Sequence, residues 1–278
     1  MNKVICEMVA ERIIEQLKQG VVPWQKPWVE RYAVSHDTGK EYSLLNQMLL
    51  GEAGEYITFK QCEAEKGKVK KGAKSRIVVY WNMIKKEEEK DGEIKVKTVP
   101  ILKYYRVFNV NDCEGIEHKF LKEGSVREHD SIKEAEDIVE GYKARNNGLK
   151  VFEVDSESAY YSASKDRIVV PKREQFRAIG EFYSTLFHEM VHSTGHESRL
   201  NRLNKTESFG FGSDEYGKEE LVAECGAAML SNMCGITDAF DNSVAYIGGW
   251  IKAISEKPEI VVTAAGKAEK AVGFIMGQ

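Results

Sequence analysis

Hydrophobic residues at the start of the chain recur at every fourth position, which is the spacing of one face of an α-helix. The residues that share this spacing are Ile5, Val9, Ile13 and Leu17. They predict an amphipathic helix over residues 3–19, and Gly20 is a typical helix-ending residue. Two Pro-Trp steps follow and force an extended path, because the residue before a proline avoids the helical conformation.

Short helical and alternating patterns follow between residues 42 and 108. We expect short helices over 42–50 and 60–66, and strands over 55–59, 77–84 and 99–108. Asp91-Gly92, between the last two strands, is typical of a hairpin turn. The first part of the chain is therefore expected to contain a small antiparallel sheet.

The second part of the chain is mainly helical in its pattern. Ser131 and Glu134 form a capping box that opens a helix to about residue 146. Short strands are expected over 150–154, 159–162 and 167–170, and the last of them is closed by Pro171. Further helices are expected from Phe182 to a stop at Gly195, and over 218–234, 238–255 and 258–277.

Composition indicates a soluble globular protein, and the length suggests two domains or one large one. The chain has 278 residues, of which 42% are hydrophobic and 30% are charged. No apolar run approaches the roughly 18 residues of a membrane helix, and acidic residues in the N-terminal segment exclude a signal peptide. Five scattered cysteines form no CxxC pair, which favours the reducing cytoplasm. A polar stretch places a linker at 123–130, between domains of residues 1–122 and 131–278.

Charge is distributed unevenly between these two parts. Residues 1–122 contain 22 Lys and Arg against 18 Asp and Glu, a net charge of +4, whereas the remainder contains 18 against 26, a net charge of −8. A polyanion is therefore expected to bind the first part. The basic residues that we expect to contact it lie in one glycine-containing loop: Lys68, Lys70, Lys71, Lys74 and Arg76.

Aromatic residues accompany these cations. Trp24 and Trp28 flank Lys26, an arrangement in which the rings stack on unpaired bases while the cation meets a phosphate. The predicted strands add five more rings: Tyr80, Trp81, Tyr104, Tyr105 and Phe108. The alternative is that the tryptophans pack in the core and that the lysines form a solvated loop.

The strongest chemical signal is the motif His188-Glu189-x-x-His192. Two histidines four residues apart lie on one face of a helix, so both imidazoles can hold one Zn²⁺ at about 2.0–2.1 Å. Glu189 is then placed as the general base that activates a zinc-bound water, as in HExxH peptidases. The alternative is a pair of surface histidines on an amphipathic helix.

A third ligand is expected from the helical run over 218–230. Glu220 and Glu224 lie one turn apart there, and a carboxylate completes a His₂Glu site with an open fourth position. We expect Glu220 to be the ligand and Glu224 to accept a ring N–H from a ligating histidine; the reverse assignment and Glu219 stay open. His196 comes two residues too early for the third histidine of HExxHxxGxxH enzymes, so we expect it beside the pocket or on the surface.

A peptidase also needs a strand that binds its substrate and a donor that stabilises the oxyanion. The strand over 166–170 is our candidate for an edge strand that pairs with an extended peptide. His196, Arg199 and Tyr216 are the candidate oxyanion donors.

Several segments of the chain occur in the same order in ArdC-type antirestriction proteins, and the chain resembles that family over nearly its whole length. The segments are GVVPWQKPW, YSLLN, YITFKQ followed by KVKKGAKS, DRIVVP, FYSTLFHEMVHSTGHESRLNR and EELVAECGAAML. These proteins resemble the N-terminal part of TraC-like plasmid primases. The stretch 42–46 departs from the pattern, in which we expect a glycine near Leu44.

The resemblance implies an α+β protein of a mobile genetic element that protects entering DNA from restriction. Its N-terminal α+β domain, with a small antiparallel sheet, would bind single-stranded DNA. Its C-terminal domain would be a mainly helical, zincin-like metallopeptidase with a short sheet, in which His188, His192 and the pair Glu220 and Glu224 surround Zn²⁺ and Glu189 is the base. The implied partners are single-stranded DNA and an unknown protein or peptide substrate, with no membrane.

Two other functions fit the same residues. The first is a non-catalytic protein that coats single-stranded DNA and has a structural or vestigial metal site. The second is a plain cytoplasmic peptidase whose basic half recognises an acidic protein. Ligands of this type also accept Mn²⁺, Co²⁺ or Ni²⁺ in vitro.

Overall fold

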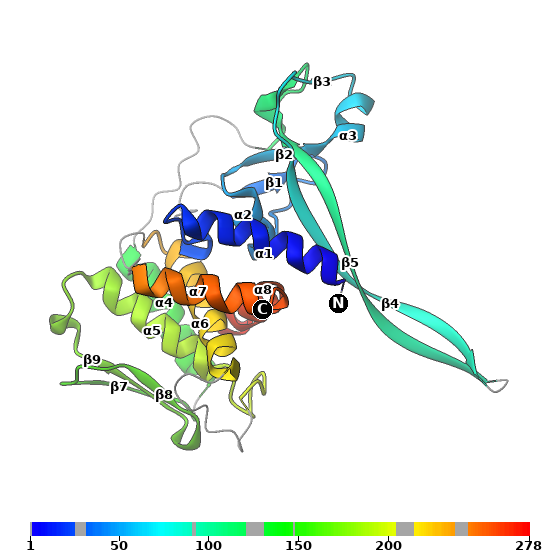
Figure 1. Ribbon diagram of the computed structural model, residues 1–278. Helices are drawn as coiled ribbons and strands as arrows, with labels where there is room; N and C mark the ends of the chain where they lie inside the picture. The colour runs from blue at the N-terminus through cyan, green and yellow to red at the C-terminus, as the bar shows by residue number, and fades with distance from the viewer. Residues whose placement is uncertain are drawn as a thin grey trace.

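The computed structural model describes residues 2–25, 32–90, 93–120, 131–146, 148–203, 214–236 and 244–278; the side chains at 25, 82–100, 131, 214–216 and 244–246 are outside this description. Within these ranges the fold is α+β, as expected from the sequence, with one larger sheet in each half of the chain (Figure 1). The predicted hairpin tip at 91–92 and the predicted linker at 123–130 lie outside the described residues.

Helix α1 (Lys3–Lys18) buries the apolar face that its sequence pattern predicts. Ile5, Val9, Ile13 and Leu17 are all buried. Gly20 follows with a φ of 77°, a left-handed conformation that glycine adopts without strain and that ends the helix. The buried face packs against α7 (Val244–Glu256) and α8 (Glu259–Met276).

The first half of the chain is built on a four-stranded sheet with strand order β1-β2-β5-β4. β1 runs parallel to β2, and the other neighbours are antiparallel. The strands are β1 (Ala33–Ser35), β2 (Gly54–Thr58), β4 (Arg76–Lys90) and β5 (Glu93–Asn109). The predicted short helices are α2 (Leu44–Leu50) and α3 (Phe59–Ala64). Between β2 and β4 the basic loop forms β3 (Lys68–Val69), which pairs with β6 (Cys113–Glu114).

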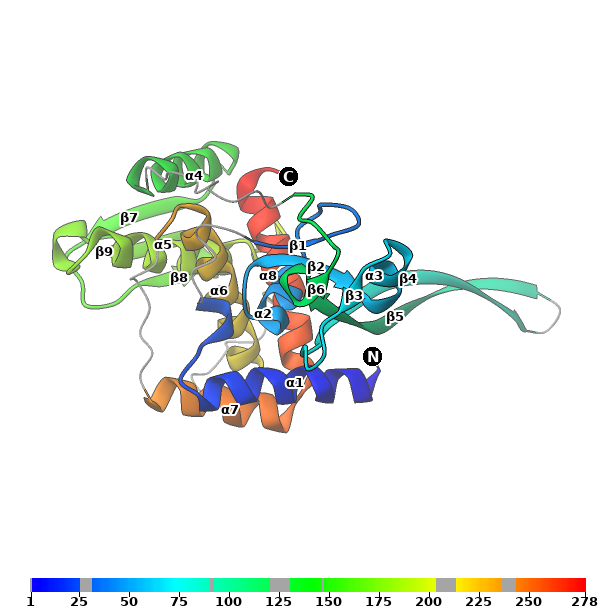
Figure 2. The same ribbon diagram turned by 90° about the horizontal axis from the view of Figure 1, so that it is seen from above.

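Strands β4 and β5 continue beyond the sheet as a two-stranded ribbon, which extends away from the rest of the molecule (Figure 1, Figure 2). The pairing runs from Arg76 opposite Val107 to Lys90 opposite Glu93. The sequence predicts only the inner parts of these strands, 77–84 and 99–108. The outer part is rich in lysine and glutamate and lacks the alternation of a half-buried strand on which the prediction depends.

The second half of the chain consists of helices packed on a three-stranded sheet of order β7-β9-β8. The strands are β7 (Lys150–Val154), β8 (Tyr160–Ser162) and β9 (Arg167–Pro171). Besides α7 and α8, the helices are α4 (Ser131–Arg145), α5 (Ile179–Ser193) and α6 (Asp214–Met233). Helix α5 packs on β8, β9 and α6, and α6 packs on α8.

The two halves share one continuous apolar core. Side chains of α1, α2 and the inner ends of β4 and β5 belong to the same cluster as those of α5, α6 and α8. Helix α8 also reaches the first half through Glu269, whose Oε1 accepts a hydrogen bond of 2.5 Å from the backbone N–H of Leu44. Because Leu44 begins α2, the carboxylate of Glu269 satisfies one of the unpaired N–H groups at that helix end.

Helices α5 and α6 approach closely at Gly226. A Cβ atom at this position would lie 2.6 Å from Cγ2 of Val191 on α5 and 3.1 Å from its Cγ1. Val191 is fully buried, and a β-branched side chain in a helix has one strongly preferred rotamer, so it cannot move aside. Glycine therefore permits the close packing of the two helices that carry the histidine motif and the acidic residues.

We expect Gly226→Ala to lower the free energy of unfolding by about 1–3 kcal/mol, because the added methyl group overpacks the contact. Denaturant unfolding of the full chain measures this change. The control is Gly266→Ala in α8, where an added Cβ meets no atom within 4 Å and where alanine is the better helix former. Equal unfolding midpoints for the two variants would contradict the packing argument.

Candidate metal centre

Helix α5 carries the histidine motif on the side that faces α6. Phe182, Leu186 and Met190 bury the apolar face of this helix in the core. The side chains of His188 and His192 keep 19% and 14% of their surface exposed. Helical spacing thus places both imidazoles at the edge of the core, where they remain accessible to solvent.

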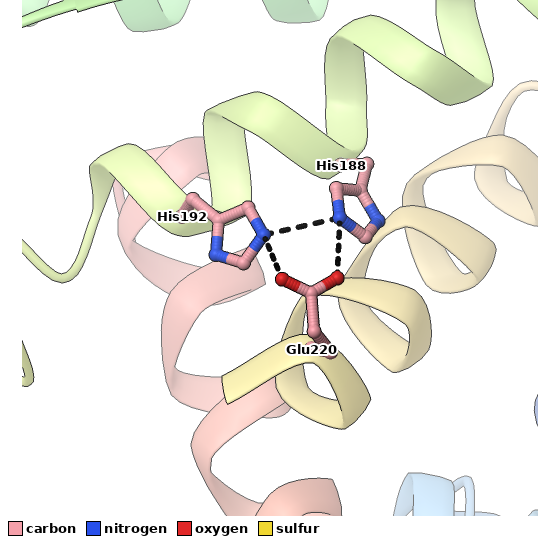
Figure 3. A group of neighbouring side chains, drawn as sticks. All are labelled: His188, His192 and Glu220. Carbon is pink, nitrogen blue, oxygen red and sulfur yellow. Dashed lines mark hydrogen bonds and ion pairs between the residues drawn. The ribbon is translucent and has the colours of Figure 1, made fainter. Parts of the chain in front are cut away.

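Three side chains from the two helices converge on one point: His188, His192 and Glu220 (Figure 3). The two Nε2 atoms are 3.0 Å apart, and each is 3.4 Å from one carboxylate oxygen of Glu220. Ligands at about 2.0–2.1 Å from a tetrahedral metal lie about 3.3 Å from one another. The three separations therefore fit the corners of a metal site, and the donor set of two imidazoles and one carboxylate suits a divalent cation.

Two further carboxylates of α6 face the other ring nitrogens. Oε1 of Glu224 is 3.8 Å from Nδ1 of His188, and Oε1 of Glu219 is 3.7 Å from Nδ1 of His192. A carboxylate at Nδ1 favours the tautomer that leaves Nε2 free to bind a metal. This geometry favours Glu220 among the three acidic residues that the sequence left as alternative ligands.

Arg202 is a part of the site that sequence reasoning missed. Its guanidinium donates a hydrogen bond of 2.8 Å to Glu219 and further bonds to the Val191 carbonyl and the Thr194 hydroxyl. It thereby fixes Glu219 against the C-terminal end of α5. No spacing rule indicates an arginine in this role, because its contacts depend on how the turn after α5 folds back.

The acidic groups give the site a strong preference for positive charge. Burial alone would lower the pKa of His192, but the carboxylates of Glu219 and Glu220 outweigh it and raise the pKa to about 10. Burial would raise the pKa of Glu220, but the two imidazoles outweigh it and lower it. A divalent cation satisfies the same demand for positive charge.

Glu189 lies beside the three converging side chains but is not one of them. Burial raises the pKa of its carboxyl, and the nearby His188 and His192 oppose that shift. Its carboxylate also accepts a hydrogen bond from the backbone N–H of Tyr161 in β8. The carboxyl of Glu189 thus lies next to the three converging side chains, where the motif predicts a general base.

The expected edge strand is corrected by the sheet topology. The candidate, residues 166–170, forms β9, which lies in the middle of the sheet and pairs with both β7 and β8. Its consecutive buried residues, Ile168 to Val170, are the signal of a central strand that the prediction overlooked. Among the described strands, β8 is the edge strand that packs on α5 and reaches Glu189.

The three candidate oxyanion donors are placed differently. Nδ1 of His196 lies 2.8 Å from the hydroxyl of Ser198 in the turn after α5, and His196 is outside the group of converging ligands. Arg199 is largely buried and bonds both to the carboxylate of Asp166 and to the hydroxyl of Tyr161. The side chain of Tyr216 lies outside the described residues.

The residues predicted to bind DNA separate into three groups. Trp24 is fully buried and packs edge-on against Trp250, with ring centroids 5.9 Å apart, so the core alternative holds for this ring. Lys26 and Trp28 lie outside the described residues. The lysines of the basic loop, Lys68, Lys70, Lys71 and Lys74, are exposed. Arg76 is half-buried and bonds to the Leu50 carbonyl and to Glu52.

None of the described helices combines the length and the apolar character that crossing a bilayer requires.

Two families match the two halves of the chain. Residues 3–108 match the N-terminal domain of anti-restriction factor ArdC, and residues 135–267 match a zincin-like metallopeptidase family. Two proteins named DNA primase TraC from Escherichia coli are each 32% identical to the chain, over 97% and 99% of its length. The chain spans only 20% and 27% of the length of these two relatives.

Solved structures extend the likeness to the whole chain. The metal-free crystal structure of the antirestriction protein ArdC from plasmid R388 has a TM-score of 0.74 and 28% identity, and covers 99% of this chain and 97% of that one. The Mn(II)-bound structure of the same protein has a TM-score of 0.74 and 27% identity, with 98% and 97% covered. With its two halves in this order and a metal-type site between α5 and α6, the chain belongs to the ArdC-type antirestriction proteins, which join an ArdC N-terminal domain to a zincin-like metallopeptidase domain.

Proposed function

We propose that this ArdC-type protein binds single-stranded DNA through its N-terminal half and hydrolyses peptide bonds at a zinc site in its C-terminal half. The observation that carries the peptidase proposal is the convergence of His188, His192 and Glu220 beside a buried Glu189. Two imidazoles and one carboxylate are the ligands of many catalytic zinc sites. The related ArdC structure with Mn(II) supports a metal of this class, and the donor types favour Zn²⁺.

The residues around the site divide the reaction between them. A divalent cation held by His188, His192 and Glu220 supplies Lewis-acid polarisation of a carbonyl oxygen and of water. Glu189 takes the proton of the attacking water and passes it to the leaving amine. The edge of β8 offers backbone groups to which an extended peptide can pair. The proposed substrate is therefore an extended segment of a protein.

The experiment that tests the peptidase proposal is hydrolysis of an unstructured protein by the full chain loaded with zinc. Fragments should appear with zinc and disappear with a chelator. If the loaded chain releases no fragments from any unstructured protein, the peptidase proposal is wrong. The non-catalytic alternative, in which the protein protects DNA by coating it, then takes its place.

The proposal of DNA binding rests on the exposed lysines of the basic loop and on the exposed rings of Trp81 in β4 and Tyr104 in β5. Single-stranded nucleic acid requires cations along its backbone and surfaces on which bases stack. The names of the matched relatives, an anti-restriction factor and DNA primases, support the same class of partner. All five cysteines carry buried, free thiols, which fits our proposal of a cytoplasmic protein.

We expect the full chain to bind labelled oligo(dT) with an affinity that falls steeply with salt, because each neutralised phosphate contributes about −0.7 to the slope of log K against log salt. Fluorescence anisotropy at several salt concentrations measures the slope. A chain that recognises an acidic protein instead of nucleic acid would leave the anisotropy of the oligonucleotide unchanged.

A further inference from the structure

The base of the β4–β5 ribbon displays aromatic rings on both of its faces. Trp81 and Tyr104 are 43% and 44% exposed, and Tyr80 and Tyr105 are 52% and 48% exposed. Residues directly opposite in an antiparallel pair share a face, and the faces alternate along each strand. The register of β4 and β5 therefore assigns each ring to a face.

The first face carries Trp81 and Tyr104. Val79 lies opposite Tyr104, and Trp81 lies opposite Leu102, so the two rings are diagonal neighbours across the strands, at a distance that aromatic side chains can span. The second face carries Tyr80 and Tyr105 in the same diagonal relation, because Tyr80 lies opposite Lys103 and Tyr105 opposite Val78.

Among the described residues, the first face is the one that brings an arginine without an ion pair into a groove. The next row on this face is Ile77 opposite Arg106, and both residues line a groove of about 560 Å³ between α1 and the base of the ribbon. Arg106 donates to the neutral hydroxyl of Ser75 at 3.1 Å, so that contact leaves its charge available. Rows on one face follow each other at about 6.8 Å. Tyr104 is therefore one row from the groove and Trp81 is two rows from it.

The balance of charge in the groove is cationic. Four basic residues line it, Arg12, Lys74, Arg76 and Arg106, against the two acidic residues Glu11 and Glu15. Arg12 pairs with Glu15 at 2.7 Å, and Arg76 pairs with Glu52 outside the groove. Lys74 has no ion pair within the described part of the chain. Lys74 and Arg106 are thus the cations that remain for a ligand.

We propose that a single strand of nucleic acid binds along the first face of the ribbon, with bases stacked on Trp81 and Tyr104 and phosphates in the groove beside Lys74 and Arg106. The inference rests on the proposed DNA binding and specifies its site. Stacking on these rings requires an unpaired base, because the faces of the bases in a duplex are already covered by their neighbours. The second face has the rings and Lys103 but leads to Arg76, whose charge is paired.

The two faces provide matched variants for the test. We expect the double variant Trp81→Ala, Tyr104→Ala to raise the Kd for labelled oligo(dT) at least about tenfold, because one stacked base is worth roughly 1–3 kcal/mol. The control Tyr80→Ala, Tyr105→Ala removes two rings of similar exposure from the opposite face and should leave the Kd unchanged. The single variant Trp81→Phe should bind oligo(dT) about as well as the wild type, because any aromatic ring can stack on a base.

The cations are tested by the salt dependence of the same titration. We expect Arg106→Gln, and separately Lys74→Gln, to reduce the magnitude of the salt slope by about 0.7, the contribution of one phosphate contact on a single strand. Thermal melting of each variant in the absence of DNA shows whether the fold is intact.

Each outcome decides between defined alternatives. If the wild-type chain fails to bind oligo(dT) at low salt, the proposed DNA binding itself is wrong. If the wild type binds and the two double variants bind equally well, the strand lies elsewhere and this site is wrong. If Trp81→Ala, Tyr104→Ala lowers the melting temperature but leaves the Kd unchanged, the two rings serve only to cover Val79 and Leu102. Equally tight binding of a blunt duplex would likewise overturn the stacking.

Discussion

Replacing His188 with alanine is expected to lower the affinity of the full chain for Zn²⁺ more than about hundredfold. Loss of an outer carboxylate partner already costs about 10- to 100-fold in metal affinity, and this substitution removes one of the three converging ligands themselves. Glu220→Gln should act in the same direction, because the amide keeps the shape of the side chain but loses its charge. Competition with a chromophoric chelator measures both affinities.

The control for this experiment is His196→Ala, which removes a histidine of the same sequence segment that lies outside the ligand group and bonds to Ser198. Its zinc affinity should equal that of the wild type. Should His188→Ala retain its zinc while His196→Ala loses it, the metal would be held by a different set of residues. Thermal melting without metal separates loss of a ligand from loss of the fold.

The second large effect is expected from Glu189→Gln, which should reduce the rate of peptide hydrolysis by about 10²- to 10⁴-fold. The amide has nearly the same shape and can still accept the hydrogen bond from Tyr161, but it cannot take a proton from water. Because Glu189 is not among the converging ligands, zinc content should not change. Single-turnover hydrolysis and metal analysis on the same preparation measure the two effects.

Glu181→Gln is the matched control, because Glu181 lies in the first turn of the same helix and should tolerate the change without effect on either measurement. Loss of zinc from Glu189→Gln would show that this residue is a ligand. Full hydrolytic activity would show that another group is the base. Protection of DNA by an inactive Glu189→Gln variant would assign the antirestriction effect to DNA binding alone.

The sequence predicted those parts of the site that depend on short-range spacing. The relation between His188 and His192 follows from helical geometry within α5 and needs no tertiary information. The choice among Glu219, Glu220 and Glu224 could not be made in this way. All three are on α6, and only the packing of α6 against α5 places one carboxylate at both Nε2 atoms and the other two at Nδ1 atoms.

The fold was predicted least well where pairing partners are distant or elements are very short. The strands β1, β3 and β6 have two or three residues, too few for a periodicity. The assignment of residues 166–170 to an edge was wrong because strand order is not encoded in one strand alone. From the sequence alone, the ring of Trp24 fits stacking on a base and burial in the core equally well. The structure buries it against Trp250, and because the two residues are far apart in the chain, no local pattern indicates this contact.

The shared core has a consequence for the synthesis of the protein. Helices α1 and α2 leave the ribosome early, but part of the apolar surface that they bury is covered by α8, which follows some two hundred residues later at about 5–20 residues per second. During that interval the nascent first half exposes hydrophobic surface, a state prone to aggregation. Slow translation ahead of α8, or depletion of chaperones, should therefore lower the soluble yield more than the stability of the finished protein would indicate.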